Sequence, residues 1–406
     1  MKILSVTAAL PIPDVFENEN DVTLKFFGHL KADDPEVSVD HLYPALCAPK
    51  FMERFKSDWG MYNRIFEKKG FVHDGMRVQM CPYYCLRRFG WSRALTSHSL
   101  VWLNRKLETE MNIGEYDVIH AQKIFPAGML ACHLARRFKK PLVFSVRREM
   151  DLWDHWYSRG LARKLLRQAS GIVSINYKMN ELLVEDGFDS QFVPHGLDDF
   201  FFDEYERTTP QNPVRILSLC RLMKLKHLDK VLLAMKNLRE KGFDFLYTIA
   251  GTGEDEARLK SLTHELGLED IVEFMGRVEY MDVPQVMKDH DLFVMPSYPE
   301  IMGRVYFEAM AQGVPILGAN ESGIDGFFEN WKSGVSVNHA DLQELEGALQ
   351  TLISDPELRR IMGQKGRSLV QPFSWDSIVK KYQKVYEDAL QKSNRVDGRL
   401  QRSSIS

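Results

Sequence analysis

The stretch "DLFVMPSYPEIMGRVYFEAMAQGVPILGAN", residues 291–320, decides the fold of this chain. The apolar runs at 291–297 and 314–320 predict two short buried strands. Between them an apolar helical segment begins near Gly303 and stops at the Gly-Val-Pro of 313–315. A strand, a helix and a second strand in this order predict a βαβ unit, and therefore a parallel sheet.

The same alternation of strands and helices runs through both halves of the chain. In the first half we expect strands at 2–8, 36–42, 76–80, 116–122, 141–147, 171–177 and 191–196. In the second half we expect them at 214–220, 244–251, 271–277, 291–297, 314–320 and 334–337. Amphipathic helices are expected at 228–242, 255–268 and 341–355. The predicted fold class is α/β, with two Rossmann-like, doubly wound domains facing each other across a cleft.

The length of 406 residues favours two domains, because one hydrophobic core rarely serves so long a chain. A polar stretch at 198–213, which ends at a proline before a new strand, indicates the boundary. We expect an N-terminal domain over 1–200 and a C-terminal domain over 201–374. A last helix is expected over 375–392, followed by a polar, mobile tail over 393–406.

Two glutamates of the quoted stretch fall where a doubly wound sheet binds ligands, at the carboxyl ends of its strands. Glu300 is expected in the loop after the strand at 291–297, and Glu308 in the first or second turn of the following helix. A carboxylate such as that of Glu308 can accept two hydrogen bonds from a sugar diol such as a ribose. The alternative is structural: Glu308 only favours the helix start, and Glu300 is exposed.

The start of the same helix predicts a phosphate site. Its backbone amides lie at the positive end of the helix dipole, and Gly303 lets a ligand come close to the backbone. The amides belong to Met302, Gly303, Arg304 and Val305.

Arg221 and Lys226 form a second candidate cluster, at the end of the strand expected at 214–220. Two cations at the carboxyl end of a neighbouring strand would stabilise the negative charge of a diphosphate. A solvated basic loop is the alternative.

Composition excludes several classes of protein. With 44% hydrophobic and 27% charged residues, the chain is typical of soluble globular proteins. It contains no apolar run of the ~18–20 residues needed to cross a bilayer. The apolar region at its start is too short for a signal peptide, so we expect a cytoplasmic protein. Its five cysteines are scattered and offer no zinc motif. We expect no metal site and no cofactor.

The segment 77–178 is basic and aromatic, with 18 lysines and arginines against 7 acidic residues and thus a local charge of +11. Three interpretations compete: a solvated face, a patch against an anionic membrane surface or lipid phosphate, and a nucleic-acid surface. We expect no nucleic-acid partner, because no recognised binding module accompanies the charge.

The motifs of the second half resemble the donor domain of the retaining, nucleotide-sugar-dependent glycosyltransferases of family 4, which have the GT-B fold. The resemblance covers about residues 213–390 and is weaker over the first domain. "CRLMKLKH", 220–227, is similar to the family's Arg-Leu-x-x-x-Lys-Gly motif, and 295–317 contains its Glu-seven-residues-Glu signature. "FVPHGLD", "IAGTGEDEARL" and "VEFMGRV" match in order, and 373–390 resembles the helix that returns to the first domain in this fold.

The resemblance implies a role for each matched residue. Glu300 would contact the donor sugar, Glu308 the ribose, and Arg221 with Lys226 the diphosphate. The backbone at Gly276 and Arg277 would lie beside the base. His120, at a strand end in the first domain, is expected either to hydrogen-bond the sugar or diphosphate or to be a core histidine.

Departures from the family pattern fall on the acceptor and sugar side. His227 replaces the usual glycine after the lysine, and Asp325-Gly326 replaces a common Pro-Glu pair. His120-Ala-Gln122 stands in place of a His-x-His pattern, and Arg147 in place of a histidine. These changes leave the expected donor site largely untouched.

The expected function is transfer of a sugar, with retained configuration and without a metal ion, from a nucleoside diphosphate sugar to an acceptor hydroxyl. The expected acceptor is a saccharide bound to the N-terminal domain, and a lipid-linked one in bacterial surface polysaccharide assembly would suit the basic face. A nucleotide-sugar epimerase or a phosphorylase of the same fold and a non-catalytic nucleotide-binding subunit remain the alternatives.

Overall fold

The first sheet is mostly parallel, and its central strands are buried and apolar. A computed structural model describes residues 1–12, 22–47, 63–65, 67, 69–83, 99–100, 111–147, 156–203 and 212–403. The strands are β1 (Lys2–Val6), β2 (Ser38–Leu46), β3 (Gly70–His73), β4 (Met76–Tyr83), β5 (Val118–Gln122), β6 (Leu142–Val146), β7 (Gly171–Ser174) and β8 (Ser190–Phe192). Its helices are α1 (Val22–Asp33), α5 (Ala127–Phe138), α7 (Trp156–Leu166) and α8 (Tyr177–Glu185).

The second sheet is built from β9 (Val214–Leu219), β10 (Phe245–Ala250), β11 (Val272–Gly276), β12 (Leu292–Met295), β13 (Ile316–Ala319) and β14 (Val335–Val337). Its helices are α9 (Leu228–Glu240), α10 (Glu256–Glu265), α11 (Val283–Lys288), α12 (Arg304–Ala311), α13 (Leu342–Ser354) and α14 (Pro356–Val370). The last helix of the chain is α15 (Trp375–Ser403).

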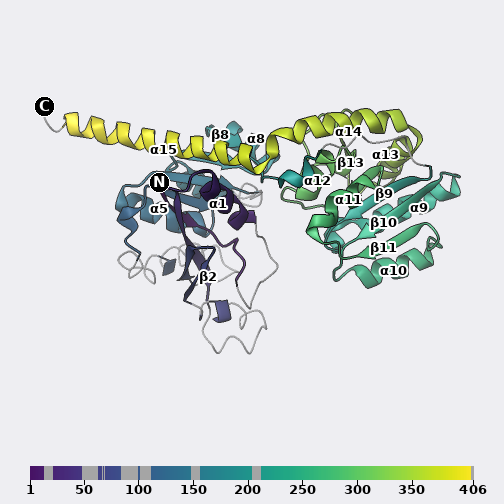
Figure 1. Ribbon diagram of the computed structural model, residues 1–406, viewed down its shortest axis with the longest axis horizontal. Helices are drawn as coiled ribbons and strands as arrows, with labels where there is room; N and C mark the ends of the chain where they lie inside the picture. The colour runs from purple at the N-terminus through teal and green to yellow at the C-terminus, as the bar shows by residue number, and fades with distance from the viewer. Residues whose placement is uncertain are drawn as a thin grey trace. The chain divides into compact units, whose positions relative to one another are not determined.

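The chain divides into two units, each with its own sheet. The first contains Met1–Ile175, Met179–His195 and Asp376–Ser406, and the second contains Asn176–Lys178 and Gly196–Trp375. Nearly all of α15, the yellow helix of Figure 1, therefore belongs to the first unit, where Gln383 donates a hydrogen bond to Asp33 of α1.

Both sheets reverse their strand order once, as doubly wound folds do. In the first unit the order is β3-β4-β2-β1-β5-β6-β7-β8, with the reversal between β1 and β5. In the second it is β11-β10-β9-β12-β13-β14, with the reversal between β9 and β12. The predicted α/β class is confirmed, and each predicted strand overlaps an observed one.

Apolar patterning explains how the helices of the second unit pack. α9 buries Leu228, Val231, Leu232, Met235 and Leu238, which recur at helical spacing on one face. α9 packs against α10 and α13, whereas α12 packs against α11 and α14 (Figure 1). Asp341 and Asp355 cap α13 and α14, because the first accepts two backbone N–H groups of its helix and the second accepts one.

Two sequence expectations need correction. The strand β3 is not among the predicted elements, and it pairs antiparallel with β4 at the edge of an otherwise parallel sheet. The last helix, expected over 375–392, extends further, since α15 continues to Ser403. Mobility of the residues at 393–406 stays a prediction. The tail contains no proline that would stop the helix, and polar residues are compatible with a helical backbone.

Candidate functional site

Lys226 and Glu300 lie where the second sheet reverses its strand order. Lys226 ends a short 3-10 helix, Lys224–Lys226, that follows β9, and Glu300 lies in the loop after β12. β9 and β12 are neighbours, with Leu217 paired to Phe293. The two loops also touch, because the Tyr298 amide donates a hydrogen bond of 2.9 Å to the Leu225 carbonyl. Both residues therefore occupy the place where doubly wound sheets bind ligands.

The carboxylate of Glu300 forms an ion pair with Lys226. The Lys226 Nζ donates to Glu300 Oε2 over 2.6 Å, and both side chains are mostly buried, at 14% and 16% exposed. The Ser297 hydroxyl donates to the same oxygen (3.1 Å), and the Ile301 amide donates to Oε1 (3.0 Å). The structural alternative of an exposed Glu300 is therefore wrong.

Ser322, on the loop after β13, fixes the backbone of Glu300. The Glu300 amide donates to the Ser322 hydroxyl (2.7 Å), and this hydroxyl donates to the Ser297 carbonyl (3.0 Å). Sequence reasoning missed Ser297 and Ser322. Their only signal was their position at the ends of predicted strands.

Gly303 and Gly323 make room for the Glu300 side chain. Gly303 has a left-handed backbone with φ of +68°, and a Cβ there would lie 2.5 Å from two ring carbons of Tyr306 and 3.2 Å from Glu300 Cγ. A Cβ on Gly323 would lie 2.9 Å from the same Glu300 Cγ. Glycine at 303 therefore has a steric cause within the chain itself. The predicted close approach of a ligand to the Gly303 backbone stays a prediction.

The helix α12 begins at Arg304, with Gly303 as its N-cap. Because glycine has no side chain, the N-cap offers no capping group to the amides of the first turn. Met302 is buried, while Arg304 and Val305 are partly exposed. Gly303 lies beside Glu300, since a Cβ there would be 3.2 Å from Glu300 Cγ. The phosphate site at the amides of 302–305 stays a prediction.

Glu308 lies in the second turn of α12, and only 5% of it is exposed. Its Oε1 accepts a hydrogen bond from Arg304 Nε over 2.9 Å. The Arg304 guanidinium also lies over the ring of Tyr280, with 4.9 Å from Cζ to the ring centroid. The side chain of Arg304 is thus held by Glu308 and Tyr280, which sequence reasoning did not anticipate.

Arg221 is placed differently from Lys226. Its side chain is 64% exposed, and its Nε lies 3.6 Å from Glu254 Oε2 on the loop after β10. That loop approaches closely because Gly251 and Gly253 lack side chains: a Cβ on either would lie about 2 Å from the carbonyl oxygens of Cys220 and Leu222.

Gly276 and Arg277 lie at the end of β11, which is separated from β9 by β10. Gly276 has φ of +75°, and its carbonyl accepts a hydrogen bond from the Gly251 amide. The Arg277 side chain is exposed and lies 3.1 Å from Glu279.

His227 departs from the family's glycine at a position where the backbone explains that glycine. Its φ is +52°, in the left-handed region where glycine is favoured. The ring is held on two sides, since Nε2 lies 3.2 Å from the Tyr298 carbonyl and the ring centroid 4.8 Å from that of His339. The His339 ring in turn stacks on Tyr298 at 4.2 Å.

His120 is a core histidine, and its assignment to the catalytic site needs correction. Its Nε2 lies 2.7 Å from the Ser145 hydroxyl, and its Nδ1 lies 2.8 Å from the Tyr386 hydroxyl of α15. Only 1% of the residue is exposed, and burial lowers the pKa of the ring to about 3. Both ring nitrogens already have partners inside the first unit, so the ring is not placed to bind a sugar.

Two features are absent from the described residues, a cluster of metal ligands and a helix able to span a membrane. No group of three or more His, Cys, Asp or Glu side chains in these ranges could hold a metal ion. No helix that the structure describes is long and apolar enough to span a membrane. The basic segment 77–178 falls partly outside the described residues, at 84–98, 101–110 and 148–155.

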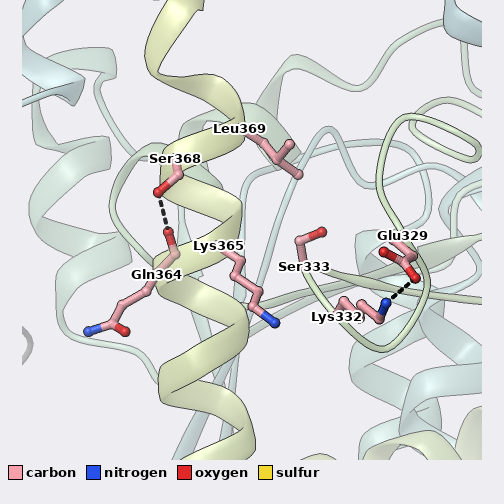
Figure 2. A pocket seen from close by; sticks show the side chains of 7 residues that line it. All are labelled: Glu329, Lys332, Ser333, Gln364, Lys365, Ser368 and Leu369. Atoms are coloured by element: carbon pink, nitrogen blue, oxygen red, sulfur yellow. Dashed lines mark hydrogen bonds and ion pairs between the residues drawn. The ribbon is translucent and has the colours of Figure 1, made fainter.

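A separate open pocket of about 440 Å³ lies between α14 and the loop before β14. Figure 2 shows Lys365 pointing from the helix toward this loop, where Lys332 and Glu329 form an ion pair. Lys332 and Ser333 precede β14, so this pocket lies at the amino edge of the sheet, whereas Lys226 and Glu300 lie at the carboxyl edge.

The chain matches two family models. Residues 37–195 match the glycosyl transferase 4-like domain, and residues 201–369 match the glycosyl transferases group 1. The chain thus contains a glycosyl transferase 4-like domain followed by a glycosyl transferases group 1 domain, in agreement with the resemblance of its motifs.

Relatives and solved structures agree with this assignment. The chain is 30% identical over 198 residues to the D-inositol 3-phosphate glycosyltransferase of Corynebacterium kroppenstedtii, which covers 47% of this chain and 44% of the relative. It is 33% identical over 152 residues to the amylovoran biosynthesis glycosyltransferase AmsK of Erwinia amylovora, covering 36% and 37%. The matched region thus spans less than half the length of either relative.

The fold resembles that of HepE from Anabaena, solved in complex with UDP. The TM-score is 0.67 at 18% identity, covering 95% of this chain and 100% of the other. The predicted GT-B fold is confirmed.

Proposed function

We propose that this protein is a retaining glycosyltransferase that moves a sugar from a nucleoside diphosphate sugar to an acceptor hydroxyl. One observation carries the proposal: the Lys226–Glu300 pair lies beside the start of α12, where the sheet reverses its strand order. The UDP bound to the structurally similar HepE supports a uridine nucleotide as the first probe.

The diphosphate would bind at the cation and the helix start. As the bond to the sugar breaks, negative charge grows on the departing diphosphate, and Lys226 and the amides at 303–305 stabilise it. Arg221 contributes from its exposed position, where solvent screens its charge. Because these groups supply the positive charge, we expect transfer without a divalent metal.

Glu300 would orient the sugar rather than attack it. Its carboxylate already accepts hydrogen bonds from Lys226, Ser297 and Ile301, so it is held rigidly beside the phosphate site. Sugar hydroxyls would bind to this fixed carboxylate. Positive charge on the sugar at the transition state, which resembles an oxocarbenium ion, would be stabilised by the same group.

The acceptor is proposed to be a saccharide in polysaccharide biosynthesis, which the relation to AmsK supports. A lipid-linked acceptor would suit the basic, aromatic segment 77–178, which would then bind the anionic inner face of a cell membrane from the cytoplasm. Sedimentation with vesicles that contain anionic lipid tests this part. Binding that falls with rising salt supports it, and absence from the pellet at every salt concentration overturns it.

The transfer itself is tested with a panel of nucleoside diphosphate sugars and oligosaccharide acceptors. Nucleotide release should depend on the acceptor, persist in EDTA, and give a product with the anomeric configuration of the donor. Consumption of the sugar nucleotide with no acceptor present would instead indicate an epimerase. Strict metal dependence or an inverted product would contradict the proposed class.

A further inference from the structure

Tyr280 links the Arg304–Glu308 pair to Asp198 and Trp375, near the two ends of the range Gly196–Trp375 in the second unit. Its hydroxyl donates a hydrogen bond of 2.6 Å to Oδ2 of Asp198. The other oxygen of Asp198 accepts a hydrogen bond of 3.1 Å from the indole Nε1 of Trp375. Burial raises the pKa of Tyr280, so the phenol keeps the proton that it donates to Asp198.

Asp198, which accepts the hydrogen bond of Tyr280, lies in a segment that further contacts hold in place. Leu197 and Ser374 form a β-bridge, and the Leu197 amide donates to the Phe373 carbonyl over 2.8 Å. The backbone of Gly196 packs closely against the indole ring of Trp375, since a Cβ at Gly196 would be 2.4 Å from the ring. These contacts hold the segment that contains Asp198. The rings of Phe200 and Tyr280 also pack in a T-shaped arrangement, with 5.4 Å between their centroids.

Tyr280 restricts where the Arg304 guanidinium can lie. The guanidinium is held between a ring face and the Glu308 carboxylate, and its side chain is 20% exposed. A cation over an aromatic face is attracted to it, more strongly where water is excluded. The ring face therefore limits the positions of the Arg304 guanidinium, and with them the position of the donor to Glu308.

We propose that Tyr280 is a positioning residue for the ribose of the bound nucleoside diphosphate, acting through Arg304 on the carboxylate of Glu308, with Asp198 as its anchor. This inference rests on the proposed function, since it assigns Glu308 to the ribose. In this inference the Arg304 side chain binds Glu308, and the Arg304 backbone amide binds the phosphate. Tyr280, Arg304 and Glu308 would therefore contribute to binding of the ribose and not to binding of the diphosphate.

The test compares ligands with and without ribose hydroxyls. UDP, 2′,3′-dideoxy-UDP and inorganic pyrophosphate are titrated into the wild type, Tyr280→Phe and Tyr280→Leu. The wild type should bind UDP more tightly than dideoxy-UDP. Tyr280→Leu should lose about tenfold in UDP affinity, the size of a buried cation–π contact, and should bind the other two ligands as the wild type does. Tyr280→Phe keeps the ring face and should show a smaller loss.

A matched control separates positioning from the general loss of an aromatic contact. Phe274 lies under Lys260 in the same unit, with 5.5 Å from Nζ to the ring centroid, so Phe274→Leu removes a cation–π contact away from Glu308. It should leave the preference for ribose intact.

The outcomes separate this inference from the proposed function. Binding of UDP by the wild type with equal losses for all three ligands in Tyr280→Leu would overturn the positioning role, as would an unchanged preference for ribose. Failure of the wild type to bind any nucleoside diphosphate, across uridine, adenosine and guanosine, would overturn the proposed function and the inference with it.

Discussion

The Lys226 ammonium and the Glu300 carboxylate lie 2.6 Å apart, on loops that follow two neighbouring strands, β9 and β12. Each charge is largely removed from water, so each depends on the other for compensation. A diphosphate that binds at Lys226 would meet a cation whose position is set in advance. The pair therefore links the phosphate position to the sugar position.

Glu300→Gln should separate binding from transfer. The amide removes a negative charge beside the diphosphate, so UDP affinity should stay at the wild-type value or increase. Transfer should fall by at least about 10²-fold, because the group facing the developing positive charge is neutral. Titration calorimetry and an acceptor-dependent nucleotide-release assay measure the two effects. Equal loss of UDP binding and of transfer would mean that Glu300 only supports the loop.

Gly303→Ala should damage the site more than the backbone strain alone explains. A left-handed non-glycine residue costs roughly 1–2 kcal/mol, and here the new Cβ would also lie 2.5 Å from the Tyr306 ring. Gly267→Ala is the matched control: Gly267 has φ of +65°, and a Cβ there would have no heavy atom of another part of the chain within 4 Å.

Chemical denaturation and UDP titration check this comparison. Gly267→Ala should lose about 1 kcal/mol of stability and bind UDP normally. Gly303→Ala should lose more stability and at least about tenfold in UDP affinity, since α12 and Glu300 must shift. Equal behaviour of the two variants would show that Gly303 is needed only for its backbone conformation.

Two buried histidines should make the first unit sensitive to acid. Burial lowers the pKa of His41 to about 4 and that of His120 to about 3, from 6.5 in each case. Between these values and pH 6.5 the unfolded chain binds protons that the folded unit does not. Stability is therefore fully present above about pH 6.5 and falls as the pH falls toward 4 and 3.

His41→Leu isolates one of these two contributions. Neither ring nitrogen of His41 has a hydrogen-bond partner among the described residues, and the edge of the Phe27 ring packs against it. The substitution should raise stability at neutral pH by about 1 kcal/mol and flatten the acid limb, measured by urea denaturation between pH 4 and 8. An unchanged pH slope would contradict the account of His41.

The fold could be predicted because its strands are short apolar runs in a regular alternation with amphipathic helices. The stretch 291–320 contains a strand, a turn glycine, a helix and a strand in sequence, so local pattern and tertiary structure agree there. β3 escaped prediction because an edge strand with alternating exposure, such as Gly70–His73, has little apolar signal. The length of α15 could not be predicted, because the polar composition of 393–403 does not distinguish a helix from an irregular segment.

The candidate site could be predicted in its positions but not in its contacts. Doubly wound sheets bind ligands at the carboxyl ends of their strands, and the sequence placed Lys226, Glu300 and Gly303 correctly at that edge. It could not predict that Lys226 pairs with Glu300 or that Tyr280 holds Arg304, because each contact joins two segments that are far apart in sequence. His120 also stands near a strand end, and only its contacts with Ser145 and Tyr386 identify it as a core residue.

The most direct measurement is the affinity of UDP for the wild type, Lys226→Ala and Lys365→Ala by titration calorimetry. Lys365 is the control, a lysine in the open pocket at the opposite edge of the same sheet (Figure 2). We predict that Lys226→Ala weakens UDP binding by at least about tenfold, because it removes the cation and leaves Glu300 uncompensated. Lys365→Ala should bind as the wild type does. UDP binding that Lys226→Ala leaves unchanged would contradict the assignment of this site.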